Sequence, residues 1–538
     1  MRKLSYLALF VAFGLGLDAC SDSEGDYVSS EEYDAGVYDA SATSFAPYDA
    51  GTSDRPSPTP LDAAAPSDAA RTDATSSPDV PAPYDASADR PDAADAADAR
   101  VACEAIPSRE PVTLYLSADD SNSMASPAIA RRMIRLGRRV PAGIVRTYEF
   151  LNYYNVPYEA AAPDHVRVVP QMRPGTAEGS YELQVGIASE RRSTADLRPM
   201  NITFVLDTSG SMGEGQRIER ERAVVRAIAS SLRAGDVVSA VTWNTEQRAP
   251  LSNYPVTGPN DPTLLSLASS LVAGGGTDLS GGLAAGYALA QRNYGEGRLN
   301  RVVLISDGIA NVGVTDETII AEASHFAERE EIYLVAVGVG DGFNDTLMDT
   351  VTDKGRGAYV FVDSDAEADI MFGGRFTETM DLAVRAVRLE LTLPWYMRVA
   401  EFHGEAISAD PRVIDPQHLA PNDAMVFHQV IQSCLGSTVD MSDHIVARAT
   451  YATRGRVPGV ETVDTTFGQL LEGSDEALRR GRAIVAWAEA LKQIANNPSS
   501  SDAILDATER TVRAARTGPD TALDEILSLI TAYRGIAR

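Results

Sequence analysis

The sequence contains two copies of the pattern Asp-x-Ser-x-Ser, which combines one carboxylate with two hydroxyls. The first copy begins at Asp119 in LSADDSNSMAS, and the second begins at Asp207 in FVLDTSGSMGE. Both are followed by a methionine. Oxygen ligands of this kind suit hard cations such as Mg²⁺, Mn²⁺ or Ca²⁺. The sequence therefore raises the question of how many cation sites the protein has.

The residues from about 200 onward alternate between short apolar runs and amphipathic helical patterns. The expected strands are ITFVL, DVVSAVTW, RVVLIS, IYLVAVGVG and AYVFV. Continuous apolar strands that alternate with helices indicate a mostly parallel sheet with helices on both faces. The predicted fold class is thus α/β, with a doubly wound sheet, a small antiparallel β module and C-terminal helices.

In a doubly wound sheet, ligands bind at the carboxyl ends of the strands. Asp207 and Asp307 each end a predicted strand, and the glycine-rich stretch AGGGTDLSGG brings Thr277 to the same edge. Together with Ser209 and Ser211, these residues offer only oxygen ligands, from three separate loops. A small oxygen-only set with room for water suits Mg²⁺, or alternatively Mn²⁺, better than a softer metal or a fully wrapped Ca²⁺.

The segments FVLDTSGSM, GGGTD and LISDG, in this order, resemble a von Willebrand factor type A (VWA) domain over roughly residues 199–378. The resemblance implies that the five residues form a metal-ion-dependent adhesion site. It also implies that the metal keeps one coordination position open for an acidic residue of a protein partner. Ser209 and Ser211 would be direct ligands, whereas Asp207 and Asp307 would act partly through water. Thr277 would bind directly or through water.

A simpler interpretation is that Asp207 and its serines cap the following helix. The two copies differ in the residues that follow them at the spacing the metal site requires. Thr277 and Asp307 lie 70 and 100 residues after Asp207, and the same offsets from Asp119 reach only Ser189 and Glu219. We therefore predict one cation site, at Asp207. The first copy is interpreted as a strand-to-helix connection, with Ser126 as the helix N-cap and Pro127 as the first helical residue.

The segments on either side of the sheet have their own patterns. YELQVGIAS predicts a half-buried strand, and VRLELTLPW and HIVARATY also alternate, so these strands are expected to pack together. One helix is predicted to place Ile129, Met133, Leu136 and Val140 on one face, and two more helices are expected near the C-terminus. This order resembles exported bacterial VWA proteins that carry an N-terminal flank and a C-terminal domain of unknown function.

The predicted domain boundaries follow from these patterns. The ranges are a signal peptide at 1–20, an acidic tether at 21–102, an N-terminal α+β flank at 103–198, the VWA domain at 199–378, a β module at 379–460 and a helical segment at 461–538.

The first 20 residues predict export. Two basic residues precede an apolar run that is too short to span a bilayer. The run ends in Leu-Asp-Ala-Cys, which resembles a lipoprotein cleavage box with Cys20 as the lipidated residue. The alternative is a plain secretory signal. We expect a lipid-anchored protein of the bacterial cell envelope, in the outer membrane or facing the periplasm.

The segment after Cys20 is rich in Ala, Asp, Ser, Pro and Thr. Residues 21–100 contain 18 acidic and 4 basic side chains, a net charge of −14. Such a segment cannot bury enough apolar surface to fold, which predicts a disordered tether. Beyond Cys20, the remaining cysteines are Cys103 and Cys434, which would either form a disulfide in an oxidising compartment or stay as separate thiols.

The formal net charge of the whole chain is −29, which argues against a nucleic-acid partner. There is no G-x-S-x-G, H-E-x-x-H or phosphate-loop motif in the sequence. The leading hypothesis is a non-enzymatic adhesion protein whose metal binds an acidic group of a protein partner. The alternatives are an envelope scaffold whose metal site is occupied by its own chain and an enzyme that acts on envelope polymers.

Overall fold

The computed structural model describes residues 109–119, 122–308, 332–355 and 357–536. All described residues belong to one compact unit. The expected signal peptide, the tether, Cys20 and Cys103 lie outside the described residues. Within the described part, none of the helices has the length and apolar character needed to cross a membrane.

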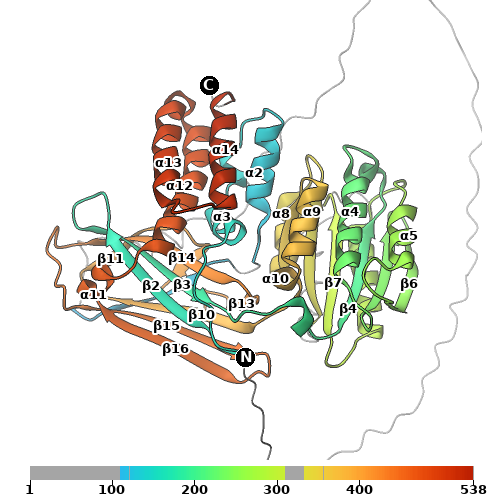
Figure 1. Ribbon diagram of the computed structural model, residues 1–538, viewed down its shortest axis with the longest axis horizontal. Coiled ribbons are helices and arrows are strands. Elements are labelled where there is room, and N and C mark those ends of the chain that lie inside the picture. The colour runs from blue at the N-terminus through green and yellow to red at the C-terminus, as the bar shows by residue number, and fades with distance from the viewer. Residues whose placement is uncertain (1–108, 120–121, 309–331, 356, 537–538) are drawn as a thin grey trace, which may run out of the picture. The chain divides into compact units, whose positions relative to one another are not determined.

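The central sheet has six strands in the order β6-β5-β4-β7-β8-β9 (Figure 1). All neighbours pair in parallel except β6, which is antiparallel to β5 at the edge. The predicted α/β sheet is therefore confirmed. The strands are β4 (Met200–Asp207), β5 (Val237–Trp243), β6 (Gln247–Pro255), β7 (Leu299–Ser306), β8 (Ile332–Val339) and β9 (Ala358–Val362).

Helices cover both faces of this sheet because its strands are apolar on both sides. Phe204 and Leu206 of β4 belong to the core on one face, and Val205 belongs to the core on the other. The helices of the first face are α4 (Arg217–Ser231), α5 (Pro262–Ser270), α9 (Asp365–Asp369), η5 (Ile370–Gly374) and α10 (Phe376–Met380). Among the described residues, those of the second are α6 (Leu279–Arg292), α8 (Asp345–Gly355) and the first part of α2 (Ala125–Arg135).

Helix α6 approaches the sheet closely through Gly282. A methyl group at this position would lie 2.4 Å from Cγ of Trp243, whose ring is fully buried. We expect Gly282→Ala to destabilise the protein by about 1–3 kcal/mol, because overpacking displaces a rigid ring. Thermal unfolding is the measurement. Gly143→Ala, where nothing lies within 4 Å, is the control and should change stability by less than about 0.5 kcal/mol; equal effects of the two substitutions would contradict the prediction.

Two antiparallel sheets form a sandwich outside the segment that resembles a VWA domain (roughly residues 199–378, hereafter the VWA segment). One has the order β12-β1-β10-β15-β16, with β13 also pairing with β10, and the other has the order β11-β14-β3-β2. The strands are β1 (Val112–Ser117), β2 (Arg167–Pro174), β3 (Ser180–Ala188), β10 (Val384–Leu393), β11 (Met397–Phe402), β12 (Ala406–Ser408), β13 (Gln417–Leu419), β14 (Ala424–Ser433), β15 (His444–Thr453) and β16 (Pro458–Thr466).

The sandwich confirms that the flanks pack together. Strand β1, before the VWA segment, pairs with β10, after it, and β3 pairs likewise with β14. The alternation predicted for residues of β10 and β15 is also seen, since Leu389, Leu391, Ile445 and Ala447 all lie in the core between the sheets.

A group of helices packs beside the sandwich (Figure 1). The α-helices are α2 (Ala125–Arg135), α3 (Thr147–Tyr154), α11 (Phe467–Glu472), α12 (Glu476–Asn496), α13 (Ser501–Ala515) and α14 (Thr521–Arg534). The 3-10 turns of the described chain are η2 (Ala142–Ile144), η3 (Thr194–Asp196), η4 (Gly210–Gly213) and η6 (Pro498–Ser500). Trp487 of α12 and Tyr533 of α14 are fully buried in the shared helical core.

Strand β3 differs from its prediction. It was expected to be half-buried, but all nine of its residues are buried. One face of β3 lies against the other sheet of the sandwich, and helix α12 covers the opposite face, where Gly481 approaches Gln184 of β3. Alternation of apolar and polar residues along a strand identifies only its more apolar face. The sequence pattern therefore did not reveal that helix α12 covers the other face of β3.

Helix α2 also differs from its prediction. It ends at Arg135, so Val140 is buried outside the helix and Leu136 is 40% exposed. Gly137 follows in the left-handed conformation (φ +69°), which ends helices. Ser126 is not the N-cap, because the helix begins at Ala125. The Ser126 hydroxyl instead donates to the carbonyl of Ile144 at 2.6 Å.

The chain enters and leaves the VWA segment at neighbouring points. Arg192 precedes β4, and Asp381 follows α10, and the two side chains form a buried ion pair. Arg301 of β7 donates to the carbonyl of Met380 at 2.7 Å beside this pair. The VWA segment is thus inserted between β3 and β10, with its two connections held side by side.

Candidate metal site

The loop after β4 carries the first three residues of the predicted site. The backbone amide of Ser209 donates to Asp207 Oδ1 at 2.9 Å, and Ser209 Oγ lies 3.0 Å from Ser211 Oγ. Asp207 and Ser209 are fully buried, whereas Ser211 is only half-buried and Gly210 is exposed. The loop therefore gathers three oxygen-bearing side chains and opens to solvent on the side of Ser211.

These side chains do not cap the next helix. Helix α4 begins at Arg217, and its N-cap residue, Gln216, makes no capping hydrogen bond. The short turn η4 has Ser209 as its N-cap, also without a side-chain cap. The interpretation that Asp207 and its serines cap the following helix is therefore wrong.

The glycine-rich loop lies directly against the first loop. Gly274 donates to the carbonyl of Thr208 at 2.8 Å, and Gly210 donates to the carbonyl of Gly275 at 3.1 Å. Gly275 has φ +86°, which side-chain-bearing residues rarely adopt. Thr277 follows this crossing and is 1% exposed. Two backbone hydrogen bonds thus hold the Thr277 loop to the loop of Ser209.

Asp307 follows β7, the strand that neighbours β4, and is fully buried. Its Oδ2 accepts a hydrogen bond from Arg217 Nη1 at 3.0 Å. Ser306, the residue before it, donates its hydroxyl to Asp207 Oδ2 at 2.6 Å. The structure therefore brings the ends of β4 and β7 together at one edge, as predicted for the carboxyl edge of a parallel sheet.

Two carboxylates near the site carry raised pKa values. Burial, and then the neighbouring Asp307, raise the pKa of Asp207 to about 7. Burial, and then the charge of Asp207, raise the pKa of Glu221 well above its usual range, although the backbone amide of Asp207 partly opposes this rise. Glu221 is fully buried on α4. The site therefore gathers carboxyl groups that oppose one another's ionisation, and a bound divalent cation would favour their ionised form.

Sequence reasoning missed three of these residues. Ser306 holds Asp207, Arg217 holds Asp307, and Glu221 adds a buried carboxylate. Glu221 lies in the charged stretch RIERER, so nothing in the sequence indicated that it is buried. Ser306 and Arg217 carried no signal either, since a serine before a loop and an arginine at a helix start are ordinary.

The oxygen donors fit Mg²⁺ by chemistry. Among the described residues, no group of three or more His, Cys, Asp or Glu side chains is placed to share a metal ion. A metal at this edge would therefore depend on hydroxyl oxygens as well as carboxylates. The predicted set of two carboxylates and three hydroxyls leaves coordination positions for water, as Mg²⁺ usually requires.

The first Asp-x-Ser-x-Ser copy has a different environment. The Asp119 carboxylate accepts hydrogen bonds from the backbone amide of Ser123 and from Asn152 Nδ2, both at 2.7 Å. Asp119 lies two residues beyond the end of β1. Ser121 lies outside the described residues. As predicted, Asp119 satisfies local polar groups in a strand-to-helix connection.

Cys434 is disulfide-bonded in the structure. Its predicted partner, Cys103, lies outside the described residues, so the pairing of these two cysteines stays a prediction. Cys434 follows β14, a strand of the sandwich.

Comparisons with known proteins place this fold in a family. Residues 201–372 match the model of the von Willebrand factor type A domain. Across 294 residues the chain is 25% identical to "Uncharacterized protein YfbK" of Escherichia coli (strain K12). The aligned region covers 53% of this chain and 50% of that protein. It is 23% identical over 249 residues to "Inter-alpha-trypsin inhibitor heavy chain H6" of Homo sapiens, covering 44% of this chain and 18% of that protein.

A solved structure, "von Willebrand factor type A from Catenulispora acidiphila", aligns with a TM-score of 0.44 and 12% identity, covering 70% of this chain and 91% of that one. Apart from Met200 at the start of β4, the segment matched by the family model covers the six strands of the central sheet. This chain therefore contains a VWA domain. The family implies a role in protein–protein interaction or adhesion. The chain spans about half the length of YfbK and less than a fifth of the heavy chain.

Proposed function

We propose that this protein is a non-enzymatic binding protein of the bacterial cell envelope, whose VWA domain holds an acidic group of a protein partner through Mg²⁺. One observation carries the proposal. The buried carboxylates of Asp207 and Asp307 lie with the hydroxyls of Ser209 and Ser211 at one edge of a VWA sheet, and the loop of Thr277 is hydrogen-bonded through its backbone to the loop after β4. Mn²⁺ is the second candidate metal.

Each predicted residue has a distinct task in this proposal. Ser209 and Ser211 would bind the metal directly, and their hydroxyls already lie 3.0 Å apart. The buried carboxylates of Asp207 and Asp307 would neutralise the metal, and Thr277 would complete the set. A bound Mg²⁺ would supply positive charge for a partner carboxylate on the exposed side of Ser211. A local divalent charge outweighs the acidic character of the surrounding chain.

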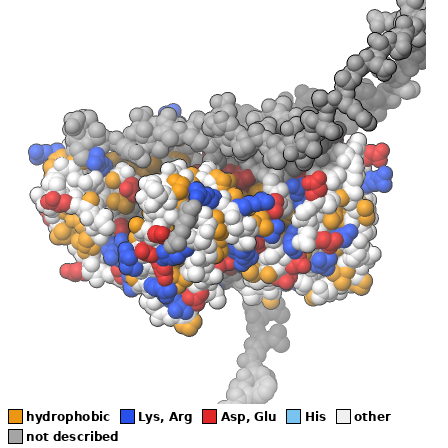
Figure 2. All heavy atoms as spheres, turned by 90° about the horizontal axis from the view of Figure 1, so that it is seen from above, with side chains coloured by type: hydrophobic (Ala, Val, Ile, Leu, Met, Phe, Trp, Pro, Cys, Tyr) orange, Lys and Arg blue, Asp and Glu red, His pale blue; other side chains and the backbone are white. Residues whose placement is uncertain are grey.

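The surface charge agrees with a protein partner. On the face shown in Figure 2, acidic and basic side chains are interspersed, and no continuous basic area is seen there. The net charge of the chain is −29. The expected signal peptide and the lipid on Cys20 would place the domain in the envelope, at the end of an acidic tether.

The test is a set of fluorescent peptides that present Asp or Glu, each paired with its Asn or Gln counterpart. With Mg²⁺, we expect at least tenfold tighter binding of an acidic peptide than of its amide counterpart, and loss of binding in EDTA. The Ser209→Ala/Ser211→Ala variant should lose this preference because it lacks two metal ligands. Fluorescence anisotropy is the measurement.

The control is Ser230→Ala, which removes an exposed hydroxyl that bonds only within helix α4. This variant should bind like the wild type. Equal binding of acidic and amide peptides across the set, with or without Mg²⁺, would contradict the proposed function.

A second candidate is an envelope scaffold whose metal site is occupied by its own chain. The net charge of −14 in residues 21–100 favours it, because these residues supply many carboxylates. Deletion of residues 21–100 should then raise the affinity for an acidic peptide. Unchanged affinity would count against occupation by the chain itself.

A further inference from the structure

Arg217 places a buried positive charge on the candidate metal site. Its side chain is 9% exposed, and its Nη1 donates both to Asp307 Oδ2 at 3.0 Å and to the carbonyl of Ser211 at 2.8 Å. The guanidinium therefore touches a predicted metal ligand and the backbone of another. A cation so close to Asp307 competes with a metal ion for the same carboxylate.

The loop after β8 leaves room for this side chain. A methyl group at Gly340 would lie 2.3 Å from Cγ of Arg217, and Gly340 has φ +88°. The other amino group of the guanidinium, Nη2, donates to the carbonyl of Asp341 at 2.7 Å. Asp341 is thus the residue that holds the far side of Arg217.

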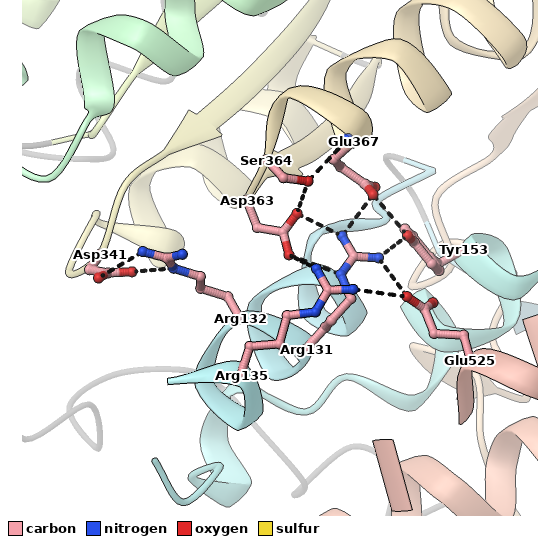
Figure 3. A network of polar contacts seen from close by, with 9 residues as sticks. All are labelled: Arg131, Arg132, Arg135, Tyr153, Asp341, Asp363, Ser364, Glu367 and Glu525. Atoms are coloured by element: carbon pink, nitrogen blue, oxygen red, sulfur yellow. Dashed lines mark hydrogen bonds and ion pairs between the residues drawn. The ribbon is translucent and has the colours of Figure 1, made fainter. Parts of the chain in front are cut away.

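Asp341 is held in turn by helix α2. Its carboxylate accepts from Arg132 Nε at 3.0 Å, and both side chains are partly exposed (Figure 3). Figure 3 shows the adjacent Arg131 reaching the other way, toward Asp363, Glu367 and Glu525. Helix α2 therefore forms ion pairs with the VWA domain at two points and with helix α14 at a third.

We propose that Arg217 is a positioning residue that restrains metal binding at Asp307, and that helix α2 holds it in place through Asp341. This inference rests on the proposed function, because it assigns the regulation of the same metal site. Two cations then compete for one carboxylate. While helix α2 is docked, Arg217 stays bound to the Asp307 carboxylate. When α2 moves, Arg217 is released and the Asp307 carboxylate can bind the metal.

Mg²⁺ titration by calorimetry on the full chain tests this inference. Arg217→Gln removes the charge and shortens the side chain, so that Asp307 loses its cationic partner, and we expect at least tenfold tighter Mg²⁺ binding. Arg132→Gln removes only the ion pair with Asp341, and we expect about threefold tighter binding. Arg220→Gln is the matched control, since it removes a charge from an exposed ion pair on the same helix and should not change the affinity.

Hydrogen exchange gives a second readout, because coupling between two sites is reciprocal. Saturating Mg²⁺ should speed amide exchange in residues 125–135 of the wild type, and less so in Arg132→Gln. A wild type that binds Mg²⁺ while Arg217→Gln binds it equally or more weakly would overturn this inference alone. Absence of Mg²⁺ binding in the wild type and in all variants would overturn the proposed function together with it.

Discussion

Asp207→Asn should abolish Mg²⁺ binding and, without metal, make the protein more stable than the wild type. The asparagine keeps an oxygen that accepts from the Ser209 amide, and its amide nitrogen can donate to the Ser306 hydroxyl, which donates to Asp207 in the wild type. It loses the charge that a metal needs, and loss of a ligand should lower Mg²⁺ affinity by at least about 100-fold. It also loses the repulsion from Asp307.

The stability gain should depend on pH in a defined direction. Because the pKa of Asp207 is raised to about 7 in the folded protein, the folded state holds a proton between about pH 4 and 7 that the unfolded state lacks. Wild-type stability from this residue therefore falls as the pH rises through that window. The asparagine of the variant has no charge to bury, so its advantage should be largest above about pH 7 and should shrink toward about pH 4.

Calorimetric Mg²⁺ titration and thermal unfolding in EDTA at pH 5 and pH 8 check these effects together. Asp236→Asn is a useful control because Asp236 is also buried, but it accepts backbone hydrogen bonds from Met200 and Arg233 away from the metal edge. This control should leave Mg²⁺ binding unchanged. Lower stability of Asp207→Asn at pH 8, with Mg²⁺ binding retained, would show that Asp207 is a structural residue.

Arg131→Met should cost about 3–5 kcal/mol of stability, because it removes one partner of a buried ionic network. Arg131 is 3% exposed and donates to Asp363 at 2.9 and 3.0 Å and to Glu367 at 2.7 Å (Figure 3). Burial raises the pKa of Glu367, whereas the bonds from Arg131 overcome burial and hold the pKa of Asp363 below its usual range. Without Arg131, both carboxylates stay buried but lose most of the positive charge and hydrogen bonds that offset the cost of their burial.

Urea denaturation measures this loss. Arg135→Met is the matched control, one turn further along α2: it faces the same Asp363 at 3.4 Å, but its side chain is 54% exposed. Its loss should stay below about 1 kcal/mol. The triple variant Arg131→Met/Asp363→Asn/Glu367→Gln should recover most of the stability, since it removes the unpaired charges. Similar losses for Arg131→Met and Arg135→Met would refute the account of the network.

The central sheet could be predicted from sequence because its signals are local. Each strand is a continuous apolar run, and Asp207 and Asp307 mark the ends of two of them, so the parallel order placed both at one edge. The edge strand β6 was not predicted, because its exposed residues have no apolar pattern. The sandwich pairing was expected only in outline, since the register of β1 with β10 joins residues more than 270 positions apart.

The polar residues that complete the site could not be predicted in the same way. Arg217 reaches Asp307 across 90 residues of sequence, and Arg131 reaches Asp363 across 232. Such pairs depend on how helices α4 and α2 are placed, which hydrophobic periodicity does not specify. The end of α2 was predicted one turn too late because the apolar spacing continued to Val140, although Gly137 offered the stop signal.

The paired connections of the VWA domain bear on how it would carry load. A partner bound at the proposed metal edge would pull on the sandwich through two chain segments at once, one leading to β3 and one to β10. These strands belong to different sheets, and the Arg192–Asp381 pair joins the segments where they meet. Tension from a bound partner would therefore be divided between both sheets at the point where the two segments meet, and we expect neither sheet to be pulled apart strand by strand from a free end.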